Sequence, residues 1–138
     1  MNGWSLQRVW LSEVSGDCVP EMASVRSLDV VLDIDALSVE QAPSGAATVT
    51  AEIAISLSDS GDTDTTCDLA AAFSLLYKPE PGGDLTALAT QTALRDAWPT
   101  WRAWAIQTLA LMEISAPGLP AVLPPALIDA GGRALSLG

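Results

Sequence analysis

Aspartate offers the most chemistry in this sequence, because it recurs at short spacing in two stretches. The first stretch, Leu28–Leu37, carries Asp29, Asp33 and Asp35 on one side of an alternating pattern. Neighbouring carboxylates can serve acid–base catalysis without histidine, but in this pattern they are more typical of the solvated face of an antiparallel strand. The second stretch, Asp59–Thr65 (DSGDTDT), has some likeness to a calcium loop but lacks the DxDxDG order and the distal glutamate. We therefore interpret both stretches as solvated carboxylates.

Nucleophilic and metal-dependent chemistry lacks its usual residues in this chain. The sequence has no histidine, which is the commonest general base and the commonest metal ligand. The two cysteines, Cys18 and Cys67, show no CxxC spacing. No glycine-rich phosphate loop or dinucleotide fingerprint occurs. The sequence therefore predicts a protein that is not an enzyme and has no catalytic residues, no metal site and no cofactor.

The N-terminus, the cysteines and the charge bound the compartment and the partners. The opening MNGWSLQRVW lacks the basic region and apolar core of a signal peptide. Two widely separated cysteines in such a chain predict reduced thiols and a cytoplasmic location. No uninterrupted apolar stretch reaches the roughly 18 residues of a membrane span. The net charge of −11 disfavours nucleic acid and favours cationic partners, and the length of 138 residues predicts one domain, 1–138.

The elements that must position these residues begin with four strands, each indicated by alternating apolar and polar residues. Turn residues separate the strands at Ser15-Gly16-Asp17, at 42–45 and at 59–65. Val19–Ser27, which contains a proline, is predicted to be a connecting loop. The predicted strands are Leu6–Glu13, Leu28–Leu37, Thr48–Ser58 and Thr66–Lys78.

A helical region follows the strands. Asp84 is a natural N-cap, and Pro99 is expected to break the helix because it lacks an N–H group and disfavours helical geometry before it. Strands followed by helices predict an α+β fold, with a four-stranded antiparallel sheet followed by helices packed on one face. The predicted segments are two tandem helices, Leu85–Ala97 and Pro99–Glu113, an extended Ile114–Pro125, and Ala130–Gly138 as a frayed end or a last short helix.

The stretch 97–111 holds three of the chain's five tryptophans and forms an apolar arc wider than a helix needs to cover one sheet. Such surplus apolar surface indicates a second partner, either another subunit or a client chain. We expect Trp101, Ala105 and Leu109 to pack on the protein's own sheet. We expect Trp104 and Leu111 to face another chain, as an oligomer interface.

Four short motifs occur in a fixed order along the chain. LQRVWLSEVS opens the first strand, and TCDLAAAFSLLY forms the fourth. WPTWR places Trp98, Pro99 and Arg102 at the opening of a helix, and Leu119–Leu127 is rich in proline and aliphatic residues. With these motifs the chain resembles the SecB family of protein-export chaperones, and the resemblance extends over residues 6–130.

The resemblance implies an ATP-independent holdase. Members of the family are cytoplasmic homotetramers, dimers of dimers, that hold unfolded preproteins in apolar grooves and pass them to the SecA motor. The basic tail of SecA docks on an acidic surface of the sheet, which Glu13, Asp17 and Asp68 match by position. The implied client groove is lined from the crossover loop, the fourth strand and the helical segments by Val19, Met22, Val25, Leu76, Trp98, Trp101 and Leu119.

The chain departs from the main family at its short N-terminus and at Thr100 and Ala103, where the family often has Tyr and Glu. In this it resembles divergent SecB-like members from actinobacteria, phages and mobile elements, some of which act on the antitoxin of a toxin–antitoxin pair. Two chaperone functions therefore stay open, a general one for preproteins and a dedicated one for an antitoxin. A third hypothesis, of another class, is a small oligomeric adaptor or structural module.

Overall fold

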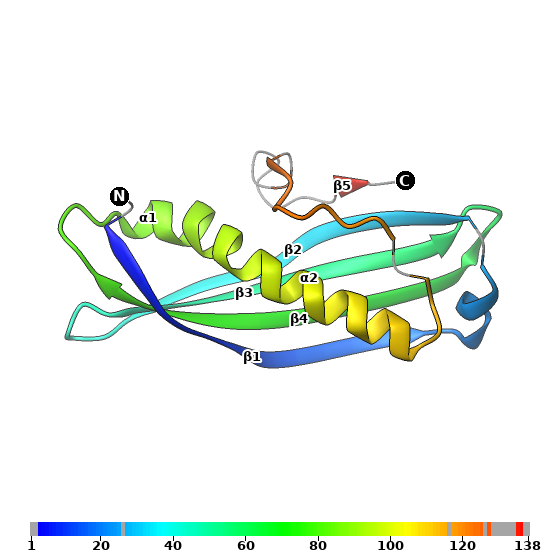
Figure 1. Ribbon diagram of the computed structural model, residues 1–138, viewed down its shortest axis with the longest axis horizontal. Coiled ribbons are helices and arrows are strands. Elements are labelled where there is room, and N and C mark those ends of the chain that lie inside the picture. Colours follow the sequence, from blue (N-terminus) through cyan, green and yellow to red (C-terminus); the bar gives the residue numbers. More distant parts are fainter. Residues whose placement is uncertain (1–2, 26, 116, 126, 128–134, 137–138) are drawn as a thin grey trace.

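The computed structural model describes residues 3–25, 27–115, 117–125, 127 and 135–136. They form an antiparallel sheet in the order β1-β4-β3-β2-β5, with a helical run lying obliquely across one face (Figure 1). The predicted α+β architecture is therefore confirmed. The strands are β1 (Trp4–Cys18), β2 (Leu28–Gln41), β3 (Ala47–Asp59), β4 (Asp62–Pro79) and β5 (Leu135–Ser136).

Among the described residues, helical structure lies between β1 and β2, after β4, and at Pro125 and Leu127. A 3-10 helix, η1 (Pro20–Ser24), lies in the predicted crossover loop between β1 and β2. A last short helix was one expectation for Ala130–Gly138. It is wrong for residues 135–136, which pair with β2 as a strand. Residues 130–134 and 137–138 lie outside the described residues. The helical run after β4 consists of α1 (Leu85–Ala87), a π-helical turn η2 (Leu88–Thr92) and α2 (Ala93–Leu111).

The alternation in β3 separates the two faces of the sheet. Every second side chain of this strand is almost completely buried, as predicted from the pattern. Burial of these aliphatic side chains is the main contribution of the strand to stability, at about 25 cal/mol for each Å2 removed from water. The buried residues are Val49, Ala51, Ile53, Ile55 and Leu57.

The predicted turn at residues 15–17 is wrong, because β1 continues through it to Cys18. The long strand β4 provides a pairing partner for each of residues 15–18, and Gly16 stands opposite Leu69. A Cβ atom on Gly16 would lie 2.7 Å from Leu69 Cδ2, so a larger residue there would require the Leu69 side chain to shift. The glycine therefore allows close packing within the sheet.

The predicted hairpin loop at 59–65 is shorter than expected. The turn consists of Ser60 and Gly61, and Asp62 already pairs with Asp59. The Asp59 carboxylate accepts a hydrogen bond from the Gly61 N–H at 2.9 Å, and Asp62 accepts one from the Asp64 N–H at 3.1 Å. These carboxylates satisfy backbone groups of the hairpin. Among the described residues, no group of three or more potential metal ligands was found.

The predicted helix break at Pro99 is also wrong, since α2 runs through this residue and the irregular turn is η2. Pro99 lies on the exposed side of α2, where water can satisfy the Arg95 carbonyl that loses its helical partner. On the buried side, Trp98 and Trp101 are both 0% exposed and stack with ring centroids 5.3 Å apart. Packing on the sheet therefore outweighs the local preference of proline.

Hydrogen bonds attach both ends of the β4-to-α2 connection. The Asp84 carboxylate accepts a bond from the Thr86 N–H at 3.0 Å, which confirms the predicted N-cap. The buried Tyr77 hydroxyl donates to Asp96 Oδ2 at 2.7 Å and joins β4 to the start of α2. Burial raises the pKa of Tyr77, and the hydrogen bond and charge of Asp96 add to the increase.

The stripe of α2 that was expected to cover the sheet does so. Trp101, Ala105 and Leu109 are each 0% exposed, and Trp101 Nε1 donates to the Ile53 carbonyl at 2.8 Å. This confirms the predicted packing of these residues on the chain's own sheet.

The segment predicted to be extended, Ile114–Pro125, is irregular over most of its described residues, and Pro125 is helical. It is hydrogen-bonded to α2, a contact that the sequence did not predict. Trp98 Nε1 donates to the Pro120 carbonyl at 3.0 Å, and Arg102 Nε donates to the Leu119 carbonyl at 3.1 Å. The WPTWR motif lies inside α2 and does not open a helix. Two of its residues attach the segment after α2 to the helix.

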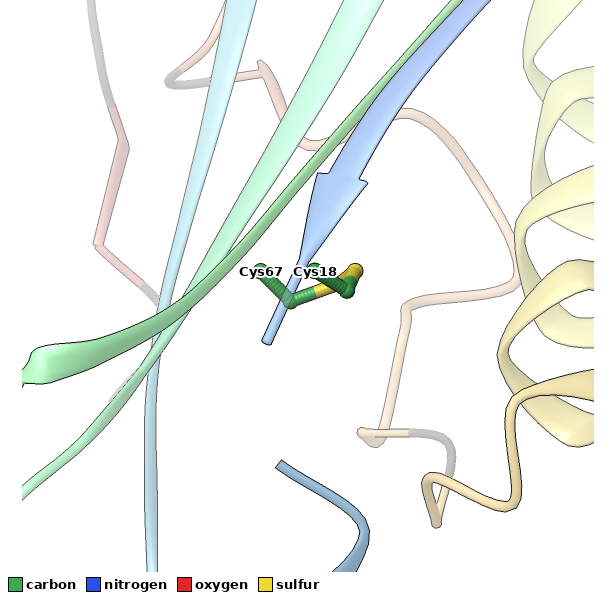
Figure 2. Close-up of a disulfide and its surroundings, with 2 residues drawn as sticks. All are labelled: Cys18 and Cys67. Atoms are coloured by element: carbon green, nitrogen blue, oxygen red, sulfur yellow. A yellow bond between two sulfur atoms is a disulfide. The ribbon is translucent and has the colours of Figure 1, made fainter. Parts of the chain in front are cut away.

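The expectation of reduced thiols is wrong for this structure, in which Cys18 and Cys67 form a disulfide. The two residues stand opposite each other in the β1–β4 ladder, with Cα atoms 4.0 Å apart (Figure 2). Their separation of 49 residues hid this proximity, which arises because β4 returns alongside β1 in antiparallel register.

Candidate functional site

A groove of about 470 Å3 lies between the end of β1, η1 and the end of α2. Its exposed rim includes Val14 (53%) of β1 and Met112 (38%) at the end of α2. Most of its lining is apolar, which suits an apolar side chain or peptide segment better than a charged ligand. The lining residues are Val14, Ser15, Gly16, Cys18, Val19, Pro20, Ala23, Leu69, Trp104, Thr108, Met112 and Ile114.

The first wall of the groove is formed by Val19 and η1, which belong to the crossover segment between β1 and β2. Pro20 occupies the first turn of η1, where its missing N–H group has no helical partner to lose. Met22 is 1% exposed and anchors η1 in the core, and its N–H donates to the Val19 carbonyl at 3.1 Å. The Val19 N–H in turn donates to the Thr66 carbonyl at 3.2 Å. These contacts leave Val19 and Pro20 facing the groove.

The second wall is formed by the last turns of α2. Trp104 is half-buried, with its ring centroid 6.1 Å from that of Trp101 in the core. The helix ends with Glu113 in a left-handed conformation (φ 59°), and the Ile114 N–H donates back to the Leu109 carbonyl at 2.9 Å. This is a Schellman-type ending. It turns the chain back, so that Ile114 is 5% exposed and lines the groove.

The structure distributes the seven predicted client-binding residues over different environments. Val19 lines the groove, and Val25 is half-buried beside the core. Leu76 pairs with Arg8 and Thr48 on the sheet face that α2 does not cover. The other four belong to the core, where a client in the groove does not contact them: Met22, Trp98, Trp101 and Leu119.

The two residues predicted for an oligomer interface also differ. Trp104 lines the groove, whereas Leu111 is 87% exposed at the end of α2. The prediction missed the contributions of Thr108 and Met112. Thr108 and Met112 follow Trp104 at intervals of four residues, which places all three on one helical stripe and was the available signal.

The uncovered face of the sheet carries the acidic surface. Glu13, Asp17 and Asp68 are all exposed, and Asp17 stands directly opposite Asp68. Alternation along β1 puts Glu13 and Asp17 on the face opposite that of Val14 and Cys18. The structure therefore brings the three predicted docking residues onto one face.

The acidic surface extends beyond those three residues. A shallow pocket of about 290 Å3 next to Asp68 is also lined by Asp33 and Asp35 of β2, with alanine and serine forming much of its floor. Partial burial raises the pKa of Asp35, and Asp33 adds to the increase through like charge and a hydrogen bond, with a further contribution from Glu52. Such crowding of carboxylates favours a cationic partner.

Comparisons with known proteins point to one fold. No protein-family model matches the sequence, and the search of curated proteins gave no match. Among solved structures, the chain is similar to the Mycobacterium tuberculosis SecB-like chaperone Rv1957 in complex with a ChAD peptide from the Rv1956 HigA1 antitoxin. The TM-score is 0.70 at 15% identity, covering 88% of this chain and 92% of that chain.

The described part of the chain contains no helix long and apolar enough to cross a membrane. The sheet order, the helical run on one face and the structural match agree with the fold implied by the sequence motifs. The chain therefore has a SecB-like fold.

Proposed function

We propose that this chain is an ATP-independent chaperone that holds apolar segments of unfolded polypeptides, and that it acts in the cytoplasm as a single domain over residues 1–138. The apolar groove between η1 and the end of α2, on a SecB-like fold, is the observation that carries the proposal. The proposal includes no catalytic, metal or cofactor role.

Capture in the groove follows from removal of apolar surface from water. A large aliphatic or aromatic client side chain gains about 1.5–3 kcal/mol on full burial, part of which is offset by ordering of the client. A groove lined by Val19, Trp104 and Met112 has few polar groups to select a sequence. We therefore expect weak selectivity and modest affinity for each segment, which several copies of the chain would strengthen together.

Unfolded preproteins and an antitoxin are the two client classes of this proposal. The complex of the M. tuberculosis SecB-like chaperone with an antitoxin peptide supports a dedicated antitoxin chaperone. The apolar lining of the groove supports both classes, since either client would present apolar segments. The alternative outside the chaperone class is a small adaptor or structural module that only oligomerises. In that case the groove would bind no client.

Charge substitutions in the groove test the chaperone proposal. Val19→Asp and Met112→Asp each place a carboxylate on a different wall. Each should abolish the delay of aggregation that the unchanged protein gives to an unfolded client, measured by light scattering. Val122→Asp is the matched control, because Val122 is 73% exposed and does not line the groove. If the unchanged protein neither delays aggregation nor binds an extended apolar peptide, the chaperone proposal fails and the adaptor is favoured.

Transfer to SecA is a second step that the acidic surface supports. The face with Glu13, Asp17 and Asp68 lies away from the groove side of the sheet, so a basic tail can dock while a client is held. We expect binding of a SecA tail peptide to weaken with salt. Glu13→Lys and Asp68→Lys should each reduce that binding by roughly three- to tenfold, measured by calorimetry. No binding by the unchanged protein would contradict a role in export and favour the antitoxin client.

A further inference from the structure

We infer that the Cys18–Cys67 disulfide is a reversible redox switch that sets the affinity of the groove for its client, with the oxidised form binding more tightly. The inference rests on the proposed function of the groove and on the proposed cytoplasmic location. Disulfides in cytoplasmic proteins are usually transient and redox-sensing rather than structural. The position of this bond connects it to one wall of the groove.

The two cysteines differ in their access to the groove. Cys18 is the last residue of β1, is half-buried and lines the groove. Cys67 belongs to β4, is 0% exposed and is part of the core. Their side chains extend from the sheet toward the side on which α2 lies (Figure 2). The bond thus ties the start of the crossover segment to the core of the sheet.

The disulfide stabilises the position of the first wall. Beyond Cys18, the crossover segment is attached to the sheet through the Val19 hydrogen bond to Thr66 and through the buried side chain of Met22. The second wall belongs to α2, which Trp101 fixes independently. Loss of the bond therefore loosens one wall relative to the other. A client must then order that wall on binding, which weakens its affinity.

The redox step is thiol–disulfide exchange with a low-molecular-weight thiol of the glutathione class. The thiolate attacks the sulfur of Cys18, because Cys67 is buried, and Cys67 leaves as a thiolate that takes up a proton. A second thiol then attacks the mixed disulfide, which releases Cys18 as a thiol and forms the disulfide of the small thiol. In the reverse direction, that small disulfide is reduced while the two cysteines are oxidised.

The test uses the full chain equilibrated in glutathione buffers of defined redox potential. A fluorescein-labelled peptide with leucine, tryptophan and two lysines reports affinity by anisotropy, and thiol alkylation with mass spectrometry reports the disulfide fraction. We expect Kd to be roughly three- to tenfold lower for the oxidised form. The change in Kd should follow the disulfide fraction with the same midpoint.

Cysteine variants provide the control. Cys18→Ser/Cys67→Ser should bind like the reduced protein at every potential, and Cys18→Ser alone, which leaves the buried Cys67 in place, should behave in the same way. Circular dichroism checks that both variants are folded. Equal Kd in both redox states, or two cysteines that stay reduced in oxidised glutathione, would overturn the switch and leave the groove proposal standing. Absence of peptide binding in both states would overturn the groove proposal and the switch together.

Discussion

At the scale of single residues, Glu113 is an unfavourable residue at a position that shapes the groove. Among the described residues it is the one non-glycine residue with a positive φ, 59°. Its N–H donates to the Ala110 carbonyl at 3.1 Å, next to the Ile114 bond that completes the helix ending. Glycine usually occupies this position because a Cβ atom is strained there. The strain is offset by the buried side chain of Ile114, which the turn directs into the groove wall.

Glu113→Gly should therefore stabilise the protein by about 1 kcal/mol, since it removes the strain and keeps the helix ending. Chemical denaturation measures the change as a higher midpoint with the same slope. Glu113→Ala is the matched control: it removes the same carboxylate but keeps the Cβ atom, so it should give no comparable gain. An equal gain from both variants would attribute the effect to charge and contradict the strain argument.

Residue-level chemistry was only partly predictable from the sequence. The carboxylates of Asp59 and Asp62 were interpreted as turn residues rather than calcium ligands, and the structure gives them backbone donors. The pairing of Cys18 with Cys67 was missed, because spacing along the chain carries no information about strand register. Register is a tertiary property set by the whole β1–β4 ladder.

At the scale of elements, the alternating pattern predicted the strands well. Predictions that rested on a single glycine or proline were wrong. β3 was recognised because burial on one face acts on every second residue. Gly16 and Pro99 were interpreted as a turn and a break, but each lies inside a regular element. Both residues are favoured in turns by local preference, and here contacts from distant segments outweigh that preference. Tertiary packing therefore determines the backbone conformation at both positions.

The junction between β4 and α2 depends on one buried hydrogen bond, from Tyr77 to Asp96. Tyr77→Phe should destabilise the protein by roughly 1.5–3 kcal/mol, because it removes a hydrogen bond to a charged group and leaves the carboxylate without that donor. Thermal denaturation measures the loss as a lower Tm. Asp96→Asn removes the charge and keeps an acceptor oxygen, so it should cost less. Additive effects in the double variant would contradict a direct interaction between the two side chains.

At the scale of the whole molecule, the fold was predictable from the sequence, but only a few residues of the groove were. The groove joins residues from β1, η1, β4 and α2, and neither its shape nor its depth follows from the periodicity of any one of them. Trp98 and Trp101 attracted attention as large apolar residues, but the sheet buries them completely. Trp104, on the neighbouring stripe, is the tryptophan of this helix that reaches the groove. Exposure of an apolar residue is decided by the whole assembly of elements.

The exposed apolar surface predicts association with further copies of the chain. The resemblance to the SecB family implies that this assembly is a homotetramer, a dimer of dimers. β1 is a long strand at the edge of the sheet, and an unpaired edge with apolar side chains favours association with another copy. Leu11 and Val14 on this strand are 43% and 53% exposed, and Leu111 at the end of α2 is 87% exposed. Surface of this kind on a chain of net charge −11 is more easily explained by subunit contact than by exposure to water.

Light scattering coupled to size exclusion should therefore give a mass four times the 14.3 kDa of one chain. Leu111→Asp should lower that mass, because a carboxylate in an apolar contact loses its hydration. Val122→Asp places the same charge at another exposed aliphatic residue, 73% exposed, and should leave the mass unchanged. A monomeric mass for the unchanged protein would contradict the tetramer, and an equal effect of both variants would show that Leu111 has no special contact. A lower mass for Leu111→Asp alone would assign the end of α2 to the contact between subunits, beside the groove wall that Trp104 and Met112 form.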